Sequence, residues 1–234
     1  MIMQPIVYLV PSVLDEAATQ TIPSYIIDAV KNCAVIFAEN ERTARRFLKS
    51  ICKEIIIDDY EWHTIHKAEE EQLNVFRQKI RENKNIAIIS EAGCPGVADP
   101  GQILVAAAQE MNAIVKPLVG PSSILLALMA SGMNGQHFEF VGYLPIDNAE
   151  RIKSISALEL VSQKKQGTQI FIETPYRNNQ LIETLLKTCK PSTRLCIAAE
   201  LTGANEFVKT KTIEAWKKEK PDLHKKPVIF LLQA

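Results

Sequence analysis

The sequence contains no glycine before Gly93, and this absence excludes the commonest nucleotide-binding loops. A G-x-G-x-x-G dinucleotide fingerprint and a Walker A loop both need glycines directly after a strand. The segment after the first apolar run is Pro11-Ser-Val-Leu-Asp15, which has none. We therefore look for ligand loops after later strands, where the glycines lie.

Cysteine motifs and long apolar runs are also missing. The five cysteines are odd in number and show no C-x-x-C or Cys/His ligand spacing, which predicts reduced thiols and no metal site. No charge occurs between Lys116 and Glu139, but Gly120-Pro121 and Asn134-Gly135 interrupt that stretch. The remaining apolar run, 124–130, is far shorter than the roughly 20 residues that cross a bilayer. No basic, signal-like segment opens the chain, so we expect a cytoplasmic protein without a membrane segment.

The charge balance gives no strong indication of a polyanionic partner. The 234 residues are 47% hydrophobic, enough for one or two domains, and the formal net charge is zero. Residues 1–120 hold 12 Lys and Arg against 16 Asp and Glu, and the remainder holds 15 against 11. This mild asymmetry allows a nucleic-acid contact on the second half, but nucleic-acid-binding domains are usually strongly basic.

Apolar runs and helical patterns alternate through the first half of the chain. We expect strands at 6–10, 33–38, 54–57, 86–89 and 113–115, with helices between them. Such alternation predicts a parallel, doubly wound sheet.

The pattern changes after residue 130. Shorter segments follow, with strands expected at 138–143, 168–172, 194–199, 206–210 and 228–232 and helices near 149–161, 180–188 and 213–218. These favour a mixed sheet. The fold class is therefore α/β, with an N-terminal α/β domain over 1–120 and a C-terminal α/β domain over 121–234.

The stretch 86–101 is the strongest candidate for a ligand loop. A buried strand leads into a loop that holds Gly93, Pro95 and Gly96, and a helical pattern follows at once. Open α/β sheets bind ligands at the carboxyl ends of their strands. The alternative is a tight βα turn with no ligand, but a turn of about two or three residues would suffice for a connection alone. Within the loop, we interpret Asp99-Pro100 first as the N-cap and first-turn proline of a helix over 101–111.

Polar residues at two other strand ends are further candidates. Ser122 and Ser123 lie where a helix over 121–132 begins, so they can cap that helix or bond a ligand, and capping is the better interpretation for each alone. Glu39 ends the second strand, and Arg42 follows one helical turn later. A carboxylate and a guanidinium at this spacing are more often a solvated ion pair than a catalytic pair.

Several ordered motifs match those of a known superfamily. Ser90-Glu-Ala-Gly-Cys-Pro95 followed by Asp99-Pro-Gly101 is similar to its S-D-A-G-T-P…D-P-G loop. Further similar segments are Pro117-Leu-Val-Gly-Pro-Ser-Ser123 (P-L-P-G-P-[CS]-A), Val141-Gly-Tyr-Leu-Pro145 (E-G-F-L-P), Phe171-Ile-Glu-Thr-Pro-Tyr-Arg177 (F-Y-E-S-P-H-R) and Ala199-Glu-Leu-Thr202 (R-E-L-T). The chain thus resembles the tetrapyrrole methylase superfamily, most closely its branch of ribosomal small-subunit RNA 2′-O-ribose methyltransferases.

The resemblance implies a two-domain α/β homodimer that binds folded S-adenosylmethionine in the cleft between its domains and methylates ribosomal RNA or the small ribosomal subunit. Methyl transfer from a sulfonium needs no metal. By the same analogy, the cofactor contacts, largely through the backbone, are Pro11, Ala92, Gly93, Cys94, Pro95, Ser122, Ser123, Glu173, Ala199, Leu201 and Pro227. We expect Glu39 to act as a base or to orient the acceptor, and Arg42 to hold a phosphate or to pair with Glu39.

The chain departs from that branch in three segments. Pro11-Ser-Val-Leu-Asp-Glu-Ala17 replaces P-T-P-I-G-N-L, Glu39-Asn-Glu-Arg42 keeps only the outer residues of E-D-T-R, and Lys226-Pro227 replaces G-E. The cofactor loops therefore match better than the expected substrate loops. Two alternatives remain: a methyltransferase of a tetrapyrrole precursor, and a cofactor-binding protein without catalytic activity.

Overall fold

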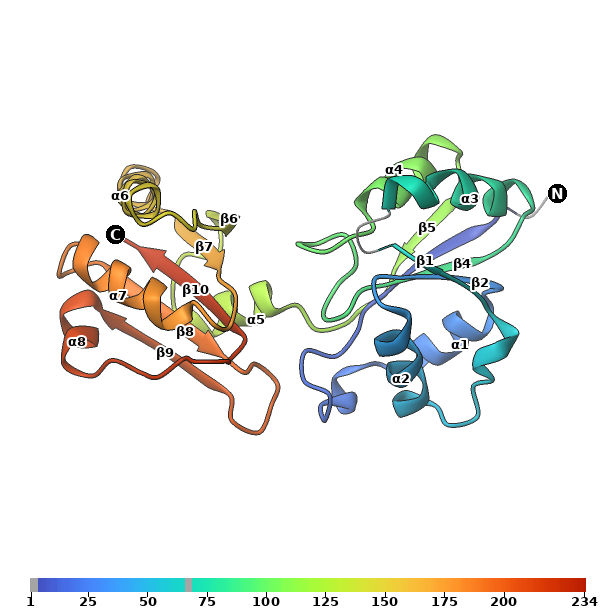
Figure 1. Cartoon of the computed structure of the whole chain (residues 1–234), viewed down its shortest axis with the longest axis horizontal. Coiled ribbons are helices and arrows are strands. Elements are labelled where there is room, and N and C mark those ends of the chain that lie inside the picture. The colour runs from blue at the N-terminus through green and yellow to red at the C-terminus, as the bar shows by residue number, and fades with distance from the viewer. Residues whose placement is uncertain (1–3, 66–68) are drawn as a thin grey trace. The chain divides into compact units, whose positions relative to one another are not determined.

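The computed structural model describes residues 4–65 and 69–234, and the chain divides into two compact units. Unit 1 is Met1–Ser122 and unit 2 is Ser123–Ala234. Each unit is built on its own five-stranded sheet with helices packed on it (Figure 1). The α/β class, with a parallel first sheet and a mixed second sheet, is confirmed.

Unit 1 holds an all-parallel sheet with the strand order β3-β2-β4-β1-β5. Its elements are β1 (Ile6–Val10), α1 (Tyr25–Lys31), β2 (Val35–Ala38), α2 (Glu41–Ile51), β3 (Glu61–Thr64), α3 (Glu69–Arg81), β4 (Ile86–Ile89), α4 (Gln102–Glu110) and β5 (Ile114–Pro117), with 3-10 turns at Thr19–Thr21 and Ile57–Asp59. Every residue of β2 and β4 is buried, because helices cover both faces of the sheet. α1 and α2 pack around Ile36 and Ile89 on one face, and α3 and α4 pack around Phe37 and Ile88 on the other (Figure 1).

The edge strand β3 does not lie where the apolar pattern placed it. The prediction of a strand over 54–57 was wrong, since Glu61–Thr64 pairs with β2. Within 54–57 only Ile55 is buried, and Ile56 is 61% exposed. The polar sequence of β3 gives no continuous apolar run, because an edge strand is covered less completely than a central one.

Unit 2 holds a mixed sheet with the strand order β6-β7-β10-β8-β9, in which β6 and β7 pair in parallel and the other pairs are antiparallel. Its elements are α5 (Ser123–Ser131), β6 (Phe138–Tyr143), α6 (Asn148–Lys165), β7 (Thr168–Ile172), α7 (Asn178–Thr188), β8 (Arg194–Ala199), β9 (Phe207–Thr212), α8 (Ile213–Lys218) and β10 (Val228–Gln233). α6, α7 and α8 share one core with Phe171, Trp216 and Phe230. Within residues 4–65 and 69–234, no helix is long and apolar enough to cross a bilayer.

Candidate active site

The carboxyl ends of the strands bring the predicted loops of unit 1 to one edge of its sheet. Val10 and Ala38 both pair with Ile89, so the segments after β1, β2 and β4 leave the sheet side by side. Leu9 pairs with Pro117, which brings the segment after β5 next to the one after β1. Parallel sheets bind ligands at this edge. The predicted site residues that follow these strand ends are Pro11, Glu39, Arg42, Ala92, Gly93, Cys94, Pro95 and Ser122.

Backbone hydrogen bonds join the loop after β1 to the loop after β4. The N–H of Ser12 donates to the carbonyl of Gly93 (2.8 Å), and the N–H of Gly93 donates to the carbonyl of Ser12 (3.2 Å). The buried Ser12 hydroxyl also donates to the Ser90 carbonyl (2.6 Å). Gly93 has φ +74°, a conformation that other residues rarely adopt. The two predicted cofactor loops are therefore held together, by a serine that the sequence pattern did not single out.

The loop after β5 packs tightly on the loop after β1. A Cβ atom on Gly120 would lie 2.3 Å from Cβ and Cγ of Pro11, so this approach requires glycine. The Cys94 thiol donates to the Pro121 carbonyl (3.6 Å), and burial, followed by the charge of Asp99, raises the pKa of that thiol. Cys94 is therefore a neutral hydrogen-bond donor here rather than a nucleophile.

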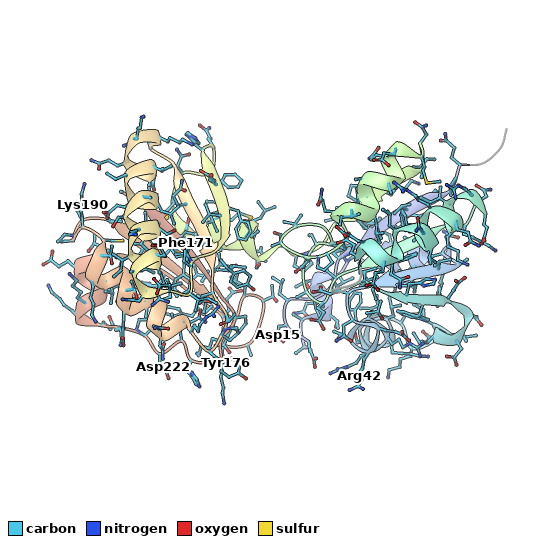
Figure 2. The ribbon with its side chains drawn as sticks, turned by 45° about the horizontal axis from the view of Figure 1, so that its top comes forward. Asp15, Arg42, Phe171, Tyr176, Lys190 and Asp222 are labelled. Atoms are coloured by element: carbon cyan, nitrogen blue, oxygen red, sulfur yellow. The ribbon has the colours of Figure 1, made fainter. Side chains whose placement is uncertain are left out.

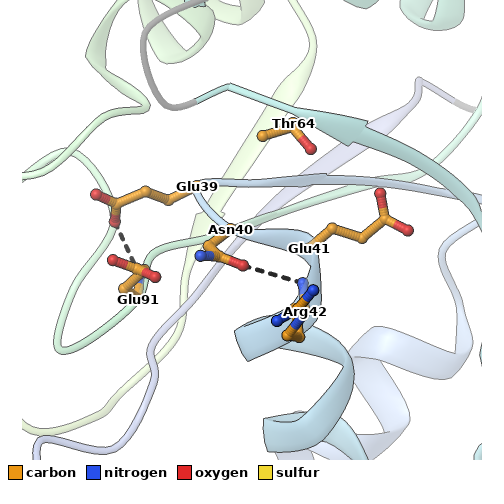
Figure 3. A pocket seen from close by; sticks show the side chains of 6 residues that line it. All are labelled: Glu39, Asn40, Glu41, Arg42, Thr64 and Glu91. Atoms are coloured by element: carbon orange, nitrogen blue, oxygen red, sulfur yellow. Dashed lines mark hydrogen bonds between the residues drawn. The ribbon is translucent and has the colours of Figure 1, made fainter.

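Glu39 and Arg42 lie in the same pocket of unit 1, which has a volume of about 420 Å³ (Figure 3). Glu39 Oε2 accepts a hydrogen bond from the N–H of Glu91 (2.9 Å). Asn40 caps α2, because its Oδ1 accepts from the N–H groups of Arg42 (3.1 Å) and Thr43 (3.3 Å). The lining residues are Glu39, Asn40, Glu41, Arg42, Thr64 and Glu91.

The lining of this pocket is predominantly acidic. Three carboxylates, those of Glu39, Glu41 and Glu91, accompany one guanidinium, that of Arg42. Glu41 is neutralised in part by Arg45, whose Nη2 lies 2.5 Å from Glu41 Oε1. Such a lining suits a hydroxyl group that must lose a proton, and it leaves Arg42 as the lining residue able to attract a phosphate.

Asp99 does not cap the helix that follows it. α4 begins at Gln102, and Gly101 occupies its N-cap position. A carboxylate from another helix supplies the cap, since Glu69 Oε1 accepts from three backbone N–H groups, those of Gly101 (3.0 Å), Ile103 (2.9 Å) and Leu104 (3.4 Å). The interpretation of Asp99-Pro100 as N-cap and first-turn proline was therefore wrong, because a residue remote in sequence satisfies these donors.

Replacing Glu69 by Ala is expected to lower the free energy of unfolding by about 1–2 kcal/mol, because the substitution leaves the first N–H groups of α4 without their acceptor. Urea unfolding measures the change. Glu70→Ala is the matched control, since Glu70 is its exposed neighbour in the same helix turn. Equal unfolding free energies for the two variants would contradict the capping role.

Asp99 instead lies partly buried beside two other carboxylates. Burial, and then the charges of Glu39 and Glu91, raise the pKa of Asp99 from 3.8 to about 7. A substantial fraction of Asp99 therefore carries a proton near neutral pH. The sequence pattern had assigned this residue to a helix cap, so its proximity to the pocket was not predicted.

Asp99→Asn is expected to weaken the pH dependence of stability. The folded-state pKa is raised, so the stabilising contribution of Asp99 is complete below its unfolded value of 3.8 and is lost as the pH rises through about 7. The amide stays neutral, so near pH 8 the variant should be more stable than the unaltered chain by about 1 kcal/mol, allowing for solvent screening. Thermal unfolding across this pH range measures the difference, and parallel pH profiles would contradict the prediction.

The predicted cofactor residues of unit 2 also lie largely together, at the edge of the sheet formed by the carboxyl ends of β7 and β8. Ile172 pairs with Ile229 and Ala199 pairs with Val228, so the residues after β7 and β8 lie beside those before β10. The N–H of Glu200 donates to the carbonyl of Pro227 (3.0 Å). The predicted residues at this edge are Glu173, Ala199, Leu201 and Pro227, whereas Ser122 ends unit 1 and Ser123 begins α5.

Among the described residues, the buried oxygen atoms at this edge that have no hydrogen-bond partner include Glu173 Oε2 and the Thr202 hydroxyl. Glu173 Oε1 accepts from the N–H of Thr174 (2.7 Å) and from the Arg177 guanidinium (2.6 Å), but Glu173 Oε2 is unpartnered. The Thr202 hydroxyl is also unpartnered, on a residue whose φ of +69° is unusual for a β-branched side chain. Buried polar groups are normally satisfied, so both atoms fit a bound molecule that carries hydrogen-bond donors. Thr202 belongs to the motif Ala199-Glu-Leu-Thr202 but was not predicted to contact the cofactor, because neither feature is visible without the fold.

The fold and the strand-end clusters agree with a known family of transferases. The family model described as "Tetrapyrrole (Corrin/Porphyrin) Methylases" matches residues 25–216. The chain belongs to this family, and it is an S-adenosylmethionine-dependent methyltransferase by class. The crystal structure of the methyltransferase CobJ shares the fold, with a TM-score of 0.65 at 14% identity, covering 99% of this chain and 94% of that one.

Relatives that are more similar in sequence carry an RNA-related name. Ribosomal RNA small subunit methyltransferase I of Buchnera aphidicola is 29% identical over 232 residues, covering 97% of this chain and 77% of the relative. The protein of the same name from Micromonospora olivasterospora is 32% identical over 170 residues, covering 73% of this chain and 51% of the relative. The chain thus spans between about half and three quarters of the length of these two relatives.

S-adenosylmethionine, the methyl donor of this family, carries groups that complement each of the two strand-end clusters taken by itself. In unit 2, Glu173 Oε2 and the Thr202 hydroxyl can accept hydrogen bonds from its amino group or its ribose hydroxyls. Its carboxylate can accept from backbone N–H groups of the loop around Gly93, where small residues let the backbone approach a ligand. The individual cofactor contacts stay predictions.

Proposed function

We propose that this chain transfers the methyl group of S-adenosylmethionine to a ribose 2′-hydroxyl of small-subunit ribosomal RNA. The acidic pocket that contains Glu39, at the carboxyl edge of the sheet of unit 1, carries this proposal. A ribose hydroxyl is a poor nucleophile, and a nearby carboxylate can accept its proton. The names of the relatives supply the choice of RNA as the acceptor.

Glu39 is the proposed base. When bound, the cofactor supplies an electrophilic methyl carbon on a sulfonium. The Glu39 carboxylate would take up the proton that the ribose hydroxyl loses when its oxygen receives this methyl group. The bond from the N–H of Glu91 holds that carboxylate in place. Arg42 is proposed to bind a phosphate beside the target ribose.

The predicted cofactor residues are proposed to act through two kinds of contact. The loop around Gly93 would contribute backbone groups, because Gly93 and Pro95 are buried and leave little side chain to offer. Glu173 would contribute its unpartnered Oε2. The remaining proposed contacts are Pro11, Ala92, Cys94, Ser122, Ser123, Ala199, Leu201 and Pro227, with Thr202 added by its buried hydroxyl.

Methyl transfer to competing acceptors tests the proposed reaction. Labelled S-adenosylmethionine is incubated with the chain and with small ribosomal subunits, protein-free ribosomal RNA or a tetrapyrrole precursor. We expect label in the RNA, in a dinucleotide that resists alkaline cleavage, because a methylated 2′-oxygen cannot attack the neighbouring phosphate. Label in the tetrapyrrole would show that the acceptor is a tetrapyrrole precursor and not RNA. Cofactor binding without any transfer would support a non-catalytic role.

A homodimer acting in the cytoplasm on ribosomal RNA or small subunits completes the proposal. Support for a second copy comes from large apolar side chains that unit 2 leaves exposed, namely Leu125, Met129, Ile146 and Leu160. Analytical ultracentrifugation of the full chain should give twice the mass of one chain, and Met129→Glu should shift it toward the monomer. A monomer for the unaltered chain at micromolar concentration would contradict the dimer.

A further inference from the structure

Tyr176 (Figure 2) is 71% exposed and lies in the turn between β7 and α7. Its ring stands beside two basic side chains. His224 meets the ring edge-on, with 6.0 Å between the ring centroids and 75° between the planes. The Nζ of Lys225 lies 6.0 Å from the centroid of the Tyr176 ring. Both basic residues come from the loop before β10, so two segments far apart in sequence build this surface.

The two segments are fixed to one another by backbone and side-chain hydrogen bonds. The N–H of Lys225, a residue with φ +61°, donates to the carbonyl of Pro175 (3.0 Å). The buried Asn178 side chain donates to the carbonyl of Lys226 (2.8 Å), and Asn179 Oδ1 accepts from the N–H of Leu223 (2.8 Å). The Tyr176 ring is therefore presented on a rigid base, although it contributes little to the core.

The segment that leads into β10 is rich in lysine. Residues 217–226 hold five lysines and one histidine against two acidic residues. Several nearby cations are already paired, since Arg177 binds Glu173 (2.6 Å) and Lys226 binds Glu200 (2.8 Å). Lys225 is exposed and forms no ion pair within residues 4–65 and 69–234, so its charge is available to an anion.

We propose that Tyr176 and Lys225 form a contact surface for a single-stranded segment of the RNA substrate, with one base stacked on the Tyr176 ring and a neighbouring phosphate bound by Lys225. Sequence-tolerant binding of single strands combines these two elements, an aromatic face and a basic side chain. The turn that presents Tyr176 also contains Glu173, a proposed cofactor contact, so this base would lie close to that end of unit 2. The inference rests on the proposed function in taking RNA as the acceptor.

Fluorescence anisotropy with the full chain and a labelled single-stranded oligoribonucleotide of small-subunit RNA sequence tests this surface. Tyr176→Ala should weaken RNA binding by about tenfold or more, and Tyr176→Phe, which keeps the aromatic face, should restore most of it. Lys225→Ala should lower the salt dependence of binding by about one phosphate contact. Tyr143→Ala is the matched control, since Tyr143 is 61% exposed in the same unit.

The outcomes separate this inference from the proposed reaction. RNA binding that depends on Tyr176, in a chain that transfers no methyl group to RNA, would support the surface while the proposed function fails. Methyl transfer with the same KM for RNA in the unaltered chain and in Tyr176→Ala would overturn the surface and leave the reaction in place. Failure of the unaltered chain to bind the oligoribonucleotide would overturn the surface. A shift of Tyr176→Ala from dimer to monomer would also overturn it, because the ring would then face a second copy.

Discussion

Glu39→Gln is expected to lower the single-turnover rate of methyl transfer to RNA by roughly 10²–10⁴-fold and to leave the affinity for S-adenosylmethionine unchanged. Glutamine has nearly the same size, and its carbonyl oxygen can still accept the hydrogen bond from the N–H of Glu91. It cannot take up the proton of the ribose hydroxyl. The substitution therefore removes the proposed chemical role while it retains the local packing.

Glu41→Gln is the matched control for this experiment. Glu41 lines the same pocket and is two residues away, but it forms an ion pair with Arg45 and has no proposed chemical role. We expect its methyl-transfer rate to stay within a few-fold of that of the unaltered chain. Equal rates for the Glu39 and Glu41 variants, with RNA at saturation, would show that Glu39 is not the base.

Gly120→Ala has the second large expected effect, a loss of about 1–3 kcal/mol in the free energy of unfolding together with weaker binding of S-adenosylmethionine. The added methyl group would lie 2.3 Å from two atoms of the Pro11 ring. A proline ring is fixed to the backbone, so it cannot rotate away, and the loops after β1 and β5 must separate instead. Denaturant unfolding and calorimetry measure the two losses.

Gly135→Ala is the control for the loss of a glycine as such, because no heavy atom lies within 4 Å of the Cβ position at Gly135. We expect the stability and cofactor affinity of this variant to be close to those of the unaltered chain. Equal unfolding free energies and equal cofactor affinities for Gly120→Ala and Gly135→Ala would show that the packing of Gly120 on Pro11 contributes to neither stability nor cofactor binding.

Much of the fold could be predicted because buried strands produce a clear pattern. β7, β8 and α8 have the bounds expected from the sequence, since apolar runs there end at polar or turn-forming residues. The same reasoning failed for β3, whose polar residues pair with β2 at the sheet edge. The pattern of apolar residues indicates which segments are buried, and β3 is only partly buried.

The site was predictable to a smaller extent. The order of strands and loops placed Glu39 and the loop around Gly93 at strand ends, and the structure brings them to one edge. The role of Glu69 as the cap of α4 depends on a contact over 32 residues of sequence, which no local pattern contains. Once Glu69 takes that role, Asp99 is left partly buried beside Glu39 and Glu91, and its raised pKa follows from burial first and then from those two charges. The roles of Glu69 and Asp99 therefore depend on hydrogen bonds between residues far apart in sequence, which the spacing of residues in the sequence does not predict.

The most direct test of the proposed function is a map of ribose methylation in small-subunit ribosomal RNA, made by mass spectrometry on cells that lack this protein. The proposal predicts that one 2′-O-methyl group is missing, that the unaltered chain restores it, and that Glu39→Gln does not. An unchanged methylation map in the absence of the protein would contradict the proposed reaction.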